Sequence, residues 1–311
     1  MKVGLYSITY LGVWYQGPAL TLFEVMDRAK KFGFDGIEID GKRPHGNPMD
    51  LDCKAREEIR NYAAKLGLDI AGVASNNDFS SPVPEHRECQ LLMVREQIKL
   101  AQDLGAPVVR LFGAWPGITF NNGVATYDMA RSAFERQFPD YPWLERMRHI
   151  QQCLKEAAAM AAEAGVTVAL QNHGPIIRHW HDVYELVKAV DNPALKICLD
   201  APMLISYEDD FVWNAARTVG KRQAHSHFGG EFKRAADGSV KRLPATFGKP
   251  LIPYPTFLKA MKEIGYDGYF CYEFCHPAVN KKDEPMGIDF IDEQTQLALE
   301  YLRGEIAKVQ G

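Results

Sequence analysis

Residues 30–40 read KKFGFDGIEID, and residues 262–273 read KEIGYDGYFCYE. Both stretches follow one order: a helix end, a glycine, an aromatic residue, Asp-Gly, and then a strand that carries glutamate. A glycine directly after the last helical residue is the usual helix C-cap, and the apolar run that follows it is typical of a buried strand. The recurrence of this unit near both ends of the chain indicates a repeated helix-to-strand architecture.

The same alternation continues along the whole chain. Helical spacing of apolar residues, ending each time in glycine, occurs at 20–33, 55–67, 94–105 and 151–165. Eight segments have strand-like composition: 2–10, 35–40, 68–75, 107–113, 166–173, 195–202, 222–230 and 269–274. Strands separated by helices form a parallel sheet, and eight such strands close a barrel. The predicted fold is therefore α/β, a single-domain (β/α)8 TIM barrel over residues 1–311.

The overall composition is that of an ordinary globular enzyme. The net charge is −4, which argues against a nucleic-acid or membrane-surface partner. The apolar run that follows Met-Lys lacks a small-residue cleavage site and is interpreted as the first strand, and no apolar run approaches the length of a membrane span. The six cysteines are scattered and form no CxxC pair, so we expect no disulfide framework and a cytoplasmic location.

Two longer stretches, 113–143 and 229–255, interrupt the alternation. Each follows a predicted strand and has an irregular pattern. Both should therefore lie on the C-terminal face of the barrel, where barrel enzymes build their active sites. We expect them to form lids or subunit contacts, in a chain that assembles as a homo-oligomer.

The last four predicted strands end in polar residues with apolar flanks. These residues are Gln171-Asn172-His173, Asp200, His225-Ser226-His227 and Glu273. Buried polar groups need partners, and alternate residues of a strand share a face. Neighbouring strands that direct oxygen and imidazole groups to one end of a barrel provide a mixed N/O metal site.

The chain resembles the xylose isomerase-like barrels, which include sugar-phosphate isomerases and epimerases. The resemblance is sharpest at 33–40, 101–113, 169–174, 196–200, 224–230 and 258–273. It implies one divalent metal ion, Mn, Mg, Co or Zn with Mn favoured. By position, the implied ligands are Gln171, Asp200, His227 and Glu273.

One of these positions departs from the family pattern. The first ligand is usually glutamate, and in the epimerases two glutamates are thought to act as paired acid and base on opposite faces of the substrate. Gln171 can bind a hard cation through its amide oxygen but cannot accept a proton. His173, two residues along on the same face, titrates near neutral pH. We therefore predict His173 as the principal base, with Glu273 as the second catalytic group, in an enzyme that enolises a keto-sugar.

Five further residues are candidate contacts for the sugar or glycoside substrate. They are Glu38, Trp14, Arg110, His225 and His276. Trp14 belongs to an aromatic-rich segment after the first strand. For Glu38 a salt bridge to Arg110 inside the barrel is an equal alternative, and His225 is also interpreted as a residue that fills the barrel.

Three other functions stay open at this point. The chain also resembles the large subunits of C-glycoside deglycosidases, which use a histidine of an ENH-like motif that QNH at 171–173 matches. This resemblance implies a lyase that cleaves 3-keto C-glycosides with a small second subunit. A DNA-repair endonuclease family shares the barrel, but its multi-zinc cluster and basic loops do not fit the acidic charge. A sugar-binding subunit without catalysis is the third alternative.

Overall fold

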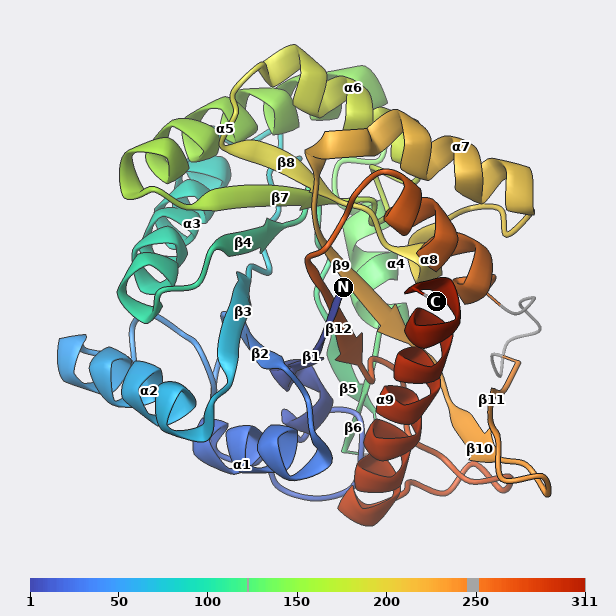
Figure 1. Ribbon diagram of the computed structural model, residues 1–311. Helices are drawn as coiled ribbons and strands as arrows, with labels where there is room; N and C mark the ends of the chain where they lie inside the picture. Colours follow the sequence, from blue (N-terminus) through green and yellow to red (C-terminus); the bar gives the residue numbers. More distant parts are fainter. Residues whose placement is uncertain (122, 245–251, 311) are drawn as a thin grey trace.

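The computed structural model describes residues 1–121, 123–244 and 252–310. Eight parallel strands close into one barrel in the order β1-β12-β9-β8-β7-β4-β3-β2 (Figure 1). Their bounds are β1 Lys2–Tyr6, β2 Gly36–Asp40, β3 Asp69–Ala74, β4 Val108–Leu111, β7 Thr167–Gln171, β8 Leu195–Cys198, β9 Gln223–Gly229 and β12 Tyr269–Glu273. Each predicted strand segment contains one of them, so the predicted (β/α)8 barrel is confirmed.

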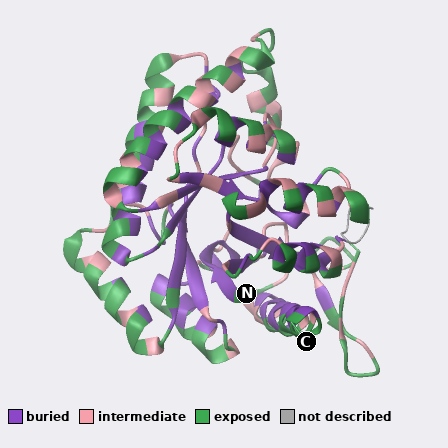
Figure 2. Ribbon diagram, turned by 45° about the horizontal axis from the view of Figure 1, so that its top comes forward, coloured by how far each residue is buried: buried purple, intermediate pink, exposed green. Residues whose placement is uncertain are grey.

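Helices surround the barrel and cover its outer surface. They are α1 Leu22–Phe32, α2 Cys53–Leu66, α3 Pro84–Leu104, α5 Trp143–Ala164, α6 Trp180–Val190, α7 Asp209–Val219, α8 Tyr254–Glu263 and α9 Ile288–Gln310. Figure 2 shows buried strands at the centre and helices whose outward sides are exposed. The main hydrophobic core thus occupies the layer between the strands and the helices.

The helix ends follow from local sequence. At α1 the Thr21 side chain accepts from the Glu24 backbone N–H while the Glu24 carboxylate accepts from the Thr21 N–H, a reciprocal capping box. The helix stops at Gly33, whose φ of 96° lies in the left-handed region that glycine adopts without strain. Helices α2, α3 and α5 end in the same way at Gly67, Gly105 and Gly165.

The recurring Asp-Gly pair has a structural explanation. The Asp35 carboxylate accepts from the Val3 backbone N–H at 2.8 Å, which ties the entry of β2 to β1. A Cβ on Gly36 would lie 2.6 Å from the Asp69 carbonyl oxygen. Near the other end of the chain, a Cβ on Gly268 would lie 2.6 Å from the hydroxyl of Tyr266. At both strand entries, close packing leaves no room for a side chain.

The two long stretches follow β4 and β9, but they are more regular than predicted. The first contains the hairpin β5 Thr119–Asn121 and β6 Val124–Thr126, and then helix α4 Asp128–Arg136. The second contains the hairpin β10 Phe232–Arg234 and β11 Val240–Arg242, while residues 245–251 lie outside the described part. Short hairpins of this kind carry little apolar periodicity, which explains the error. The role of both stretches as lids or subunit contacts stays a prediction.

Two further features concern membrane-spanning helices and disulfides. No helix within the described ranges is long and apolar enough to cross a membrane. All six cysteines are unpaired in the structure.

Candidate active site

The four implied metal ligands come from four strands that are neighbours in the barrel, β7, β8, β9 and β12. Gln171 is the last residue of β7, and Glu273 is the last residue of β12. His227 lies within β9, and Asp200 follows the end of β8. All four positions are thus at the carboxyl end of the parallel barrel, as predicted, where the loops of a TIM barrel form the active site.

Three of the four side chains are in direct contact. The amide nitrogen of Gln171 donates to Asp200 Oδ2. His227 Nδ1 lies 2.8 Å from the same Oδ2, and the His227 backbone N–H donates to Asp200 Oδ1 at 2.8 Å. Gln171 Nε2 and His227 Nδ1 are 3.3 Å apart. The structure therefore gathers Gln171, Asp200 and His227 into one buried cluster.

Glu273 stands slightly apart from this cluster. Its hydrogen-bond partner among the described residues is Cys275, whose Sγ donates to Glu273 Oε2 at 3.4 Å. Burial raises the pKa of the Glu273 carboxyl, the positive charge of His227 opposes this, and the negative charge of Asp200 adds to it. The carboxyl is therefore within electrostatic range of Asp200 and His227 and holds its proton more readily than an exposed glutamate.

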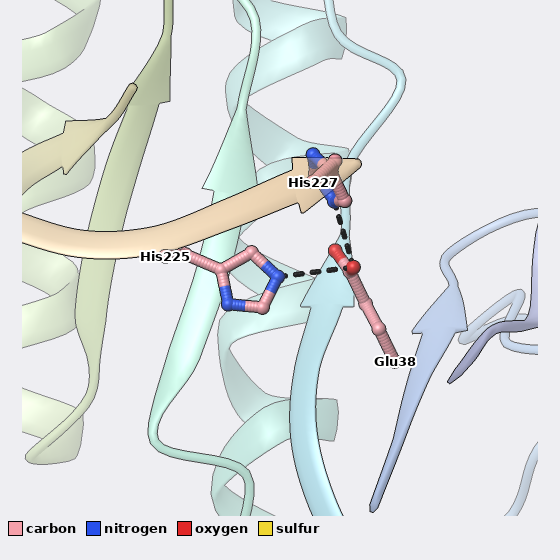
Figure 3. A group of neighbouring side chains, drawn as sticks. All are labelled: Glu38, His225 and His227. Atoms are coloured by element: carbon pink, nitrogen blue, oxygen red, sulfur yellow. Dashed lines mark hydrogen bonds and ion pairs between the residues drawn. The ribbon is translucent and has the colours of Figure 1, made fainter. Parts of the chain in front are cut away.

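A fifth polar side chain enters the cluster from across the barrel. Glu38 of β2 accepts through Oε2 from His227 Nε2 at 2.7 Å and from His225 Nε2 at 3.0 Å (Figure 3). Burial alone would raise the pKa of Glu38, but the positive charges of His227 and His225 hold it well below its usual range. Burial would lower the pKa of His227, yet Glu38 and Asp200 raise it well above its usual value.

The donor set of the cluster fits a divalent cation. Gln171 Oε1 is buried and has no hydrogen-bond partner among the described residues. A 180° flip of the side-chain amide would place this oxygen, instead of the nitrogen, toward Asp200. Carboxylate, amide and imidazole donors suit Mn, Mg, Co or Zn. Cys198 Sγ also lies 3.3 Å from Asp200 Oδ1. Cys198, Asp200 and His227 are close enough to one another to bind a single metal ion.

His173 is half-buried beside the cluster. Its Nδ1 lies 2.6 Å from the Gly174 carbonyl oxygen, which fixes the proton on Nδ1 and leaves Nε2 as an acceptor. The ring packs edge-on against Phe112 and Trp115. Burial lowers the pKa of His173 to about 4, so the imidazole is neutral at pH 7 but only weakly basic. Its role as a base stays a prediction.

The candidate substrate contacts have different surroundings. Trp14 is buried and packs against Tyr127, with 5.0 Å between ring centroids. Arg110 is buried and donates to the Ser75 carbonyl and the Tyr6 hydroxyl, so the alternative salt bridge to Glu38 is wrong. His276 Nε2 lies 3.0 Å from Glu231 Oε1, and both side chains are partly exposed. Direct contact of these residues with a substrate stays a prediction.

Glu38 and His225 contact each other inside the barrel, and both side chains are at most 1% exposed. Their contact with a substrate stays a prediction. The interpretation of His225 as a residue that fills the barrel agrees with this position.

Sequence reasoning missed two aromatic groups at this site. The Tyr6 ring, at the end of β1, stacks on the His227 ring at 5.4 Å between centroids. Trp115 stacks on Phe112 at 4.8 Å and contacts His173, which makes an aromatic wall beside the predicted base. Tyr6 ends a strand in the same way as Gln171 does, so the rule that found the ligands would have found it if aromatic residues had been included.

Comparison with known proteins agrees with the barrel fold. The family model described as xylose isomerase-like TIM barrel matches residues 26–303. L-ribulose-5-phosphate 3-epimerase UlaE of Escherichia coli (strain SMS-3-5 / SECEC) is 23% identical over 80% of this chain and 81% of the relative. D-psicose 3-epimerase of Ruminiclostridium cellulolyticum is 23% identical over 97% of both chains. A solved structure of IOLI protein with a binding zinc atom superimposes with a TM-score of 0.71 at 17% identity, covering 99% of each chain.

Proposed function

This chain belongs to the family of xylose isomerase-like TIM barrels, and on that premise we propose that it is a divalent-metal-dependent sugar enzyme of the isomerase or epimerase type. The expectation that the chain is an enzyme is thereby confirmed. The observation that carries the metal-dependent part is the cluster of Gln171, Asp200 and His227, in which the Gln171 amide oxygen has no hydrogen-bond partner among the described residues.

The relatives suggest the class of substrate. L-ribulose 5-phosphate and D-psicose are ketoses, and a 3-epimerase inverts the carbon next to the ketone. Inversion there requires that the proton on this carbon leaves and returns. We take a keto-sugar as the substrate class, since a site that enolises a ketone serves both isomerisation and epimerisation.

Four residues would hold the metal ion: Gln171, Asp200, His227 and Glu273. When bound there, a divalent metal supplies a Lewis acid that polarises the substrate carbonyl. The amide of Gln171 can bind the metal as the family's usual glutamate does, but it cannot accept a proton. The proton transfer therefore falls to two other groups of this chain.

His173 is the first of these groups. Its Nδ1 proton is committed to the Gly174 carbonyl, so Nε2 presents a lone pair that can accept a proton. Glu273 is the second, because its carboxylate ends β12 at the same end of the barrel and has an oxygen that can exchange a proton with the substrate. The Phe112–Trp115 wall excludes water from one side of His173. His173 follows strand β7 and Glu273 ends strand β12, and β8 and β9 lie between these strands in the barrel order.

The test is proton exchange in heavy water. The Mn²⁺-loaded protein would be incubated in D2O with D-psicose, L-ribulose and their phosphates, and deuterium next to the carbonyl would be followed by NMR. We expect exchange with at least one ketose and loss of exchange in His173→Ala and Glu273→Gln. If none of these ketoses exchanges while metal is bound, the proposed function is wrong.

A second candidate is a lyase that cleaves 3-keto C-glycosides. The neutral His173 beside the Phe112–Trp115 wall favours it, since an aromatic aglycone can stack on such a wall. It predicts release of the aglycone from a 3-oxo C-glycoside, with or without a small partner subunit. Absence of release under both conditions, with exchange on a ketose, decides for the isomerase or epimerase.

A further inference from the structure

One carboxylate oxygen in the barrel interior serves two histidines of the same strand. Glu38 Oε2 lies 2.7 Å from His227 Nε2 and 3.0 Å from His225 Nε2. All three side chains are at most 1% exposed, and the two imidazole rings meet edge to face at 5.1 Å. Figure 3 shows the two rings of β9 converging on the carboxylate of β2 from different sides.

The two nitrogens of His227 have different partners. Nδ1 lies 2.8 Å from Asp200 Oδ2 and 3.3 Å from Gln171 Nε2, so this nitrogen belongs to the metal-ligand cluster. Nε2 points the other way, to Glu38. An imidazole that binds metal through one nitrogen usually donates its other N–H to a carboxylate or carbonyl, which fixes both the tautomer and the orientation of the ring.

We propose that Glu38 is a positioning residue for the metal centre: it holds His227 as the Nε2–H tautomer with Nδ1 toward the metal, and it supplies the negative charge that Gln171 lacks. The proposal rests on the metal-dependent function proposed above. It goes beyond that function because it assigns the ligand atom of His227 and gives a positioning role to the buried carboxylate of Glu38, which is not one of the four implied ligands.

The charge argument follows from the ligand set. Among the implied ligands, Asp200 and Glu273 are acidic, while Gln171 is a neutral amide. Glu38 brings a further carboxylate to within 2.7 Å of the imidazole of His227. In a buried site a charge acts strongly over such a distance, and a carboxylate that accepts from a metal-bound imidazole makes that imidazole a better ligand. Glu38 thus offsets part of the charge lost at the position of Gln171.

His225 is the second histidine that contacts the Glu38 carboxylate. A buried carboxylate with one donor would be poorly compensated, and a second N–H donor reduces that cost. His225 provides it through Nε2. Because His225 and His227 are two residues apart on β9, their side chains share the inward face of the strand and both reach Glu38. The HxH pattern at 225–227 is therefore explained by one carboxylate and not by two metal ligands.

The first test is the affinity for Co²⁺, whose visible spectrum reports its ligands. Glu38→Gln keeps a hydrogen-bond acceptor but removes the charge, and we expect it to weaken Co²⁺ binding about 10- to 100-fold. Asp40→Asn is the matched control, because Asp40 is a buried carboxylate of the same strand that contacts Asn76 and Lys42 instead of a histidine. Equal Co²⁺ affinity in Glu38→Gln and the parent overturns the proposal.

Two further measurements separate the outcomes. In a Gln171→Glu background, Glu38→Gln should cost less affinity than in the parent, and an equal or larger loss contradicts the charge argument. The second measurement is the ¹⁵N NMR spectrum of the Zn²⁺-loaded parent, which needs no variant to fold. It should show His227 with a proton on Nε2, and a proton on Nδ1 would overturn the proposal. Failure of the parent to bind either metal would refute the proposed function itself, and this inference with it.

Discussion

Asp200 and His227 are joined twice. Asp200 Oδ1 accepts from the backbone N–H of His227 at 2.8 Å, and Oδ2 lies 2.8 Å from His227 Nδ1. The pairing of β8 with β9 shifts register between Ile197 and Cys198, and Asp200 lies beyond the last paired residue, free of the ladder. One side chain therefore fixes both the backbone and the ring of its neighbour, which prepares the metal-ligand nitrogen before any metal binds.

Loss of this carboxylate should release the metal. We expect Asp200→Ala, and separately Glu273→Ala, to be purified without metal, because removal of a charged ligand leaves the cation undercompensated. Asp200→Ala also leaves the buried His227 N–H without its acceptor, which should destabilise the fold by about 1–3 kcal/mol. Elemental analysis and denaturant unfolding measure the two effects. Full metal occupancy in both variants would refute the ligand assignment.

Gln171→Glu should have opposite effects with and without metal. The new carboxylate faces Asp200, so like charges repel in the metal-free protein and its melting temperature should fall. With Mn²⁺ the added charge pairs with the cation, and the dissociation constant should fall. Thermal unfolding in EDTA and in Mn²⁺ provides the comparison, with Gln171→Ala as a control that adds no charge. An unchanged Mn²⁺ affinity in Gln171→Glu would show that this position is not a ligand.

Position 173 should affect catalysis without affecting the metal. We expect His173→Ala to retain Mn²⁺ and to lower the rate of proton exchange about 100- to 10,000-fold, the usual contribution of a general base. His173 contacts Phe112 and Trp115, so His173→Phe is a control that fills the space without a basic nitrogen. Exchange at the parental rate in both variants would show that His173 is not the base. Another group would then remove the proton, or the protein would bind sugar without catalysis.

His45 should make stability depend on pH. It is buried, its Nε2 lies 2.9 Å from the Leu20 carbonyl oxygen, and burial lowers its pKa below the usual value. The unfolded chain therefore takes up the proton first, and the contribution of neutral His45 to stability is lost as the pH falls below its unfolded pKa of about 6.5. We expect His45→Gln to reduce the stability difference between about pH 7.5 and about pH 5.5. The same difference in variant and parent would contradict this assignment.

Much of the fold and part of the site follow from the sequence. Glycines 33, 67, 105 and 165 marked the ends of helices correctly, because left-handed C-caps depend on local chemistry alone. The polar residues at strand ends marked Gln171, Asp200 and His227, because parallel strands that are adjacent in a barrel bring their carboxyl ends together.

The contacts across the barrel could not be predicted in this way. β2 and β9 are not neighbours in the barrel order, so the meeting of Glu38 with His225 and His227 depends on the closure and tilt of all the strands. Alternation along a strand gives the face of a residue but not its depth. For this reason the sequence did not indicate that the Glu38 carboxylate contacts the two imidazoles. Its contact with a substrate stays a prediction.

The most direct test of the metal centre is a crystal structure of the Mn²⁺-loaded protein with anomalous scattering at the manganese edge. The account predicts one anomalous peak, coordinated by Gln171 Oε1, a carboxylate oxygen of Asp200, Nδ1 of His227 and the carboxylate of Glu273. A peak bound instead by Glu38, His225 and His227 Nε2, or no peak at either place, would contradict it.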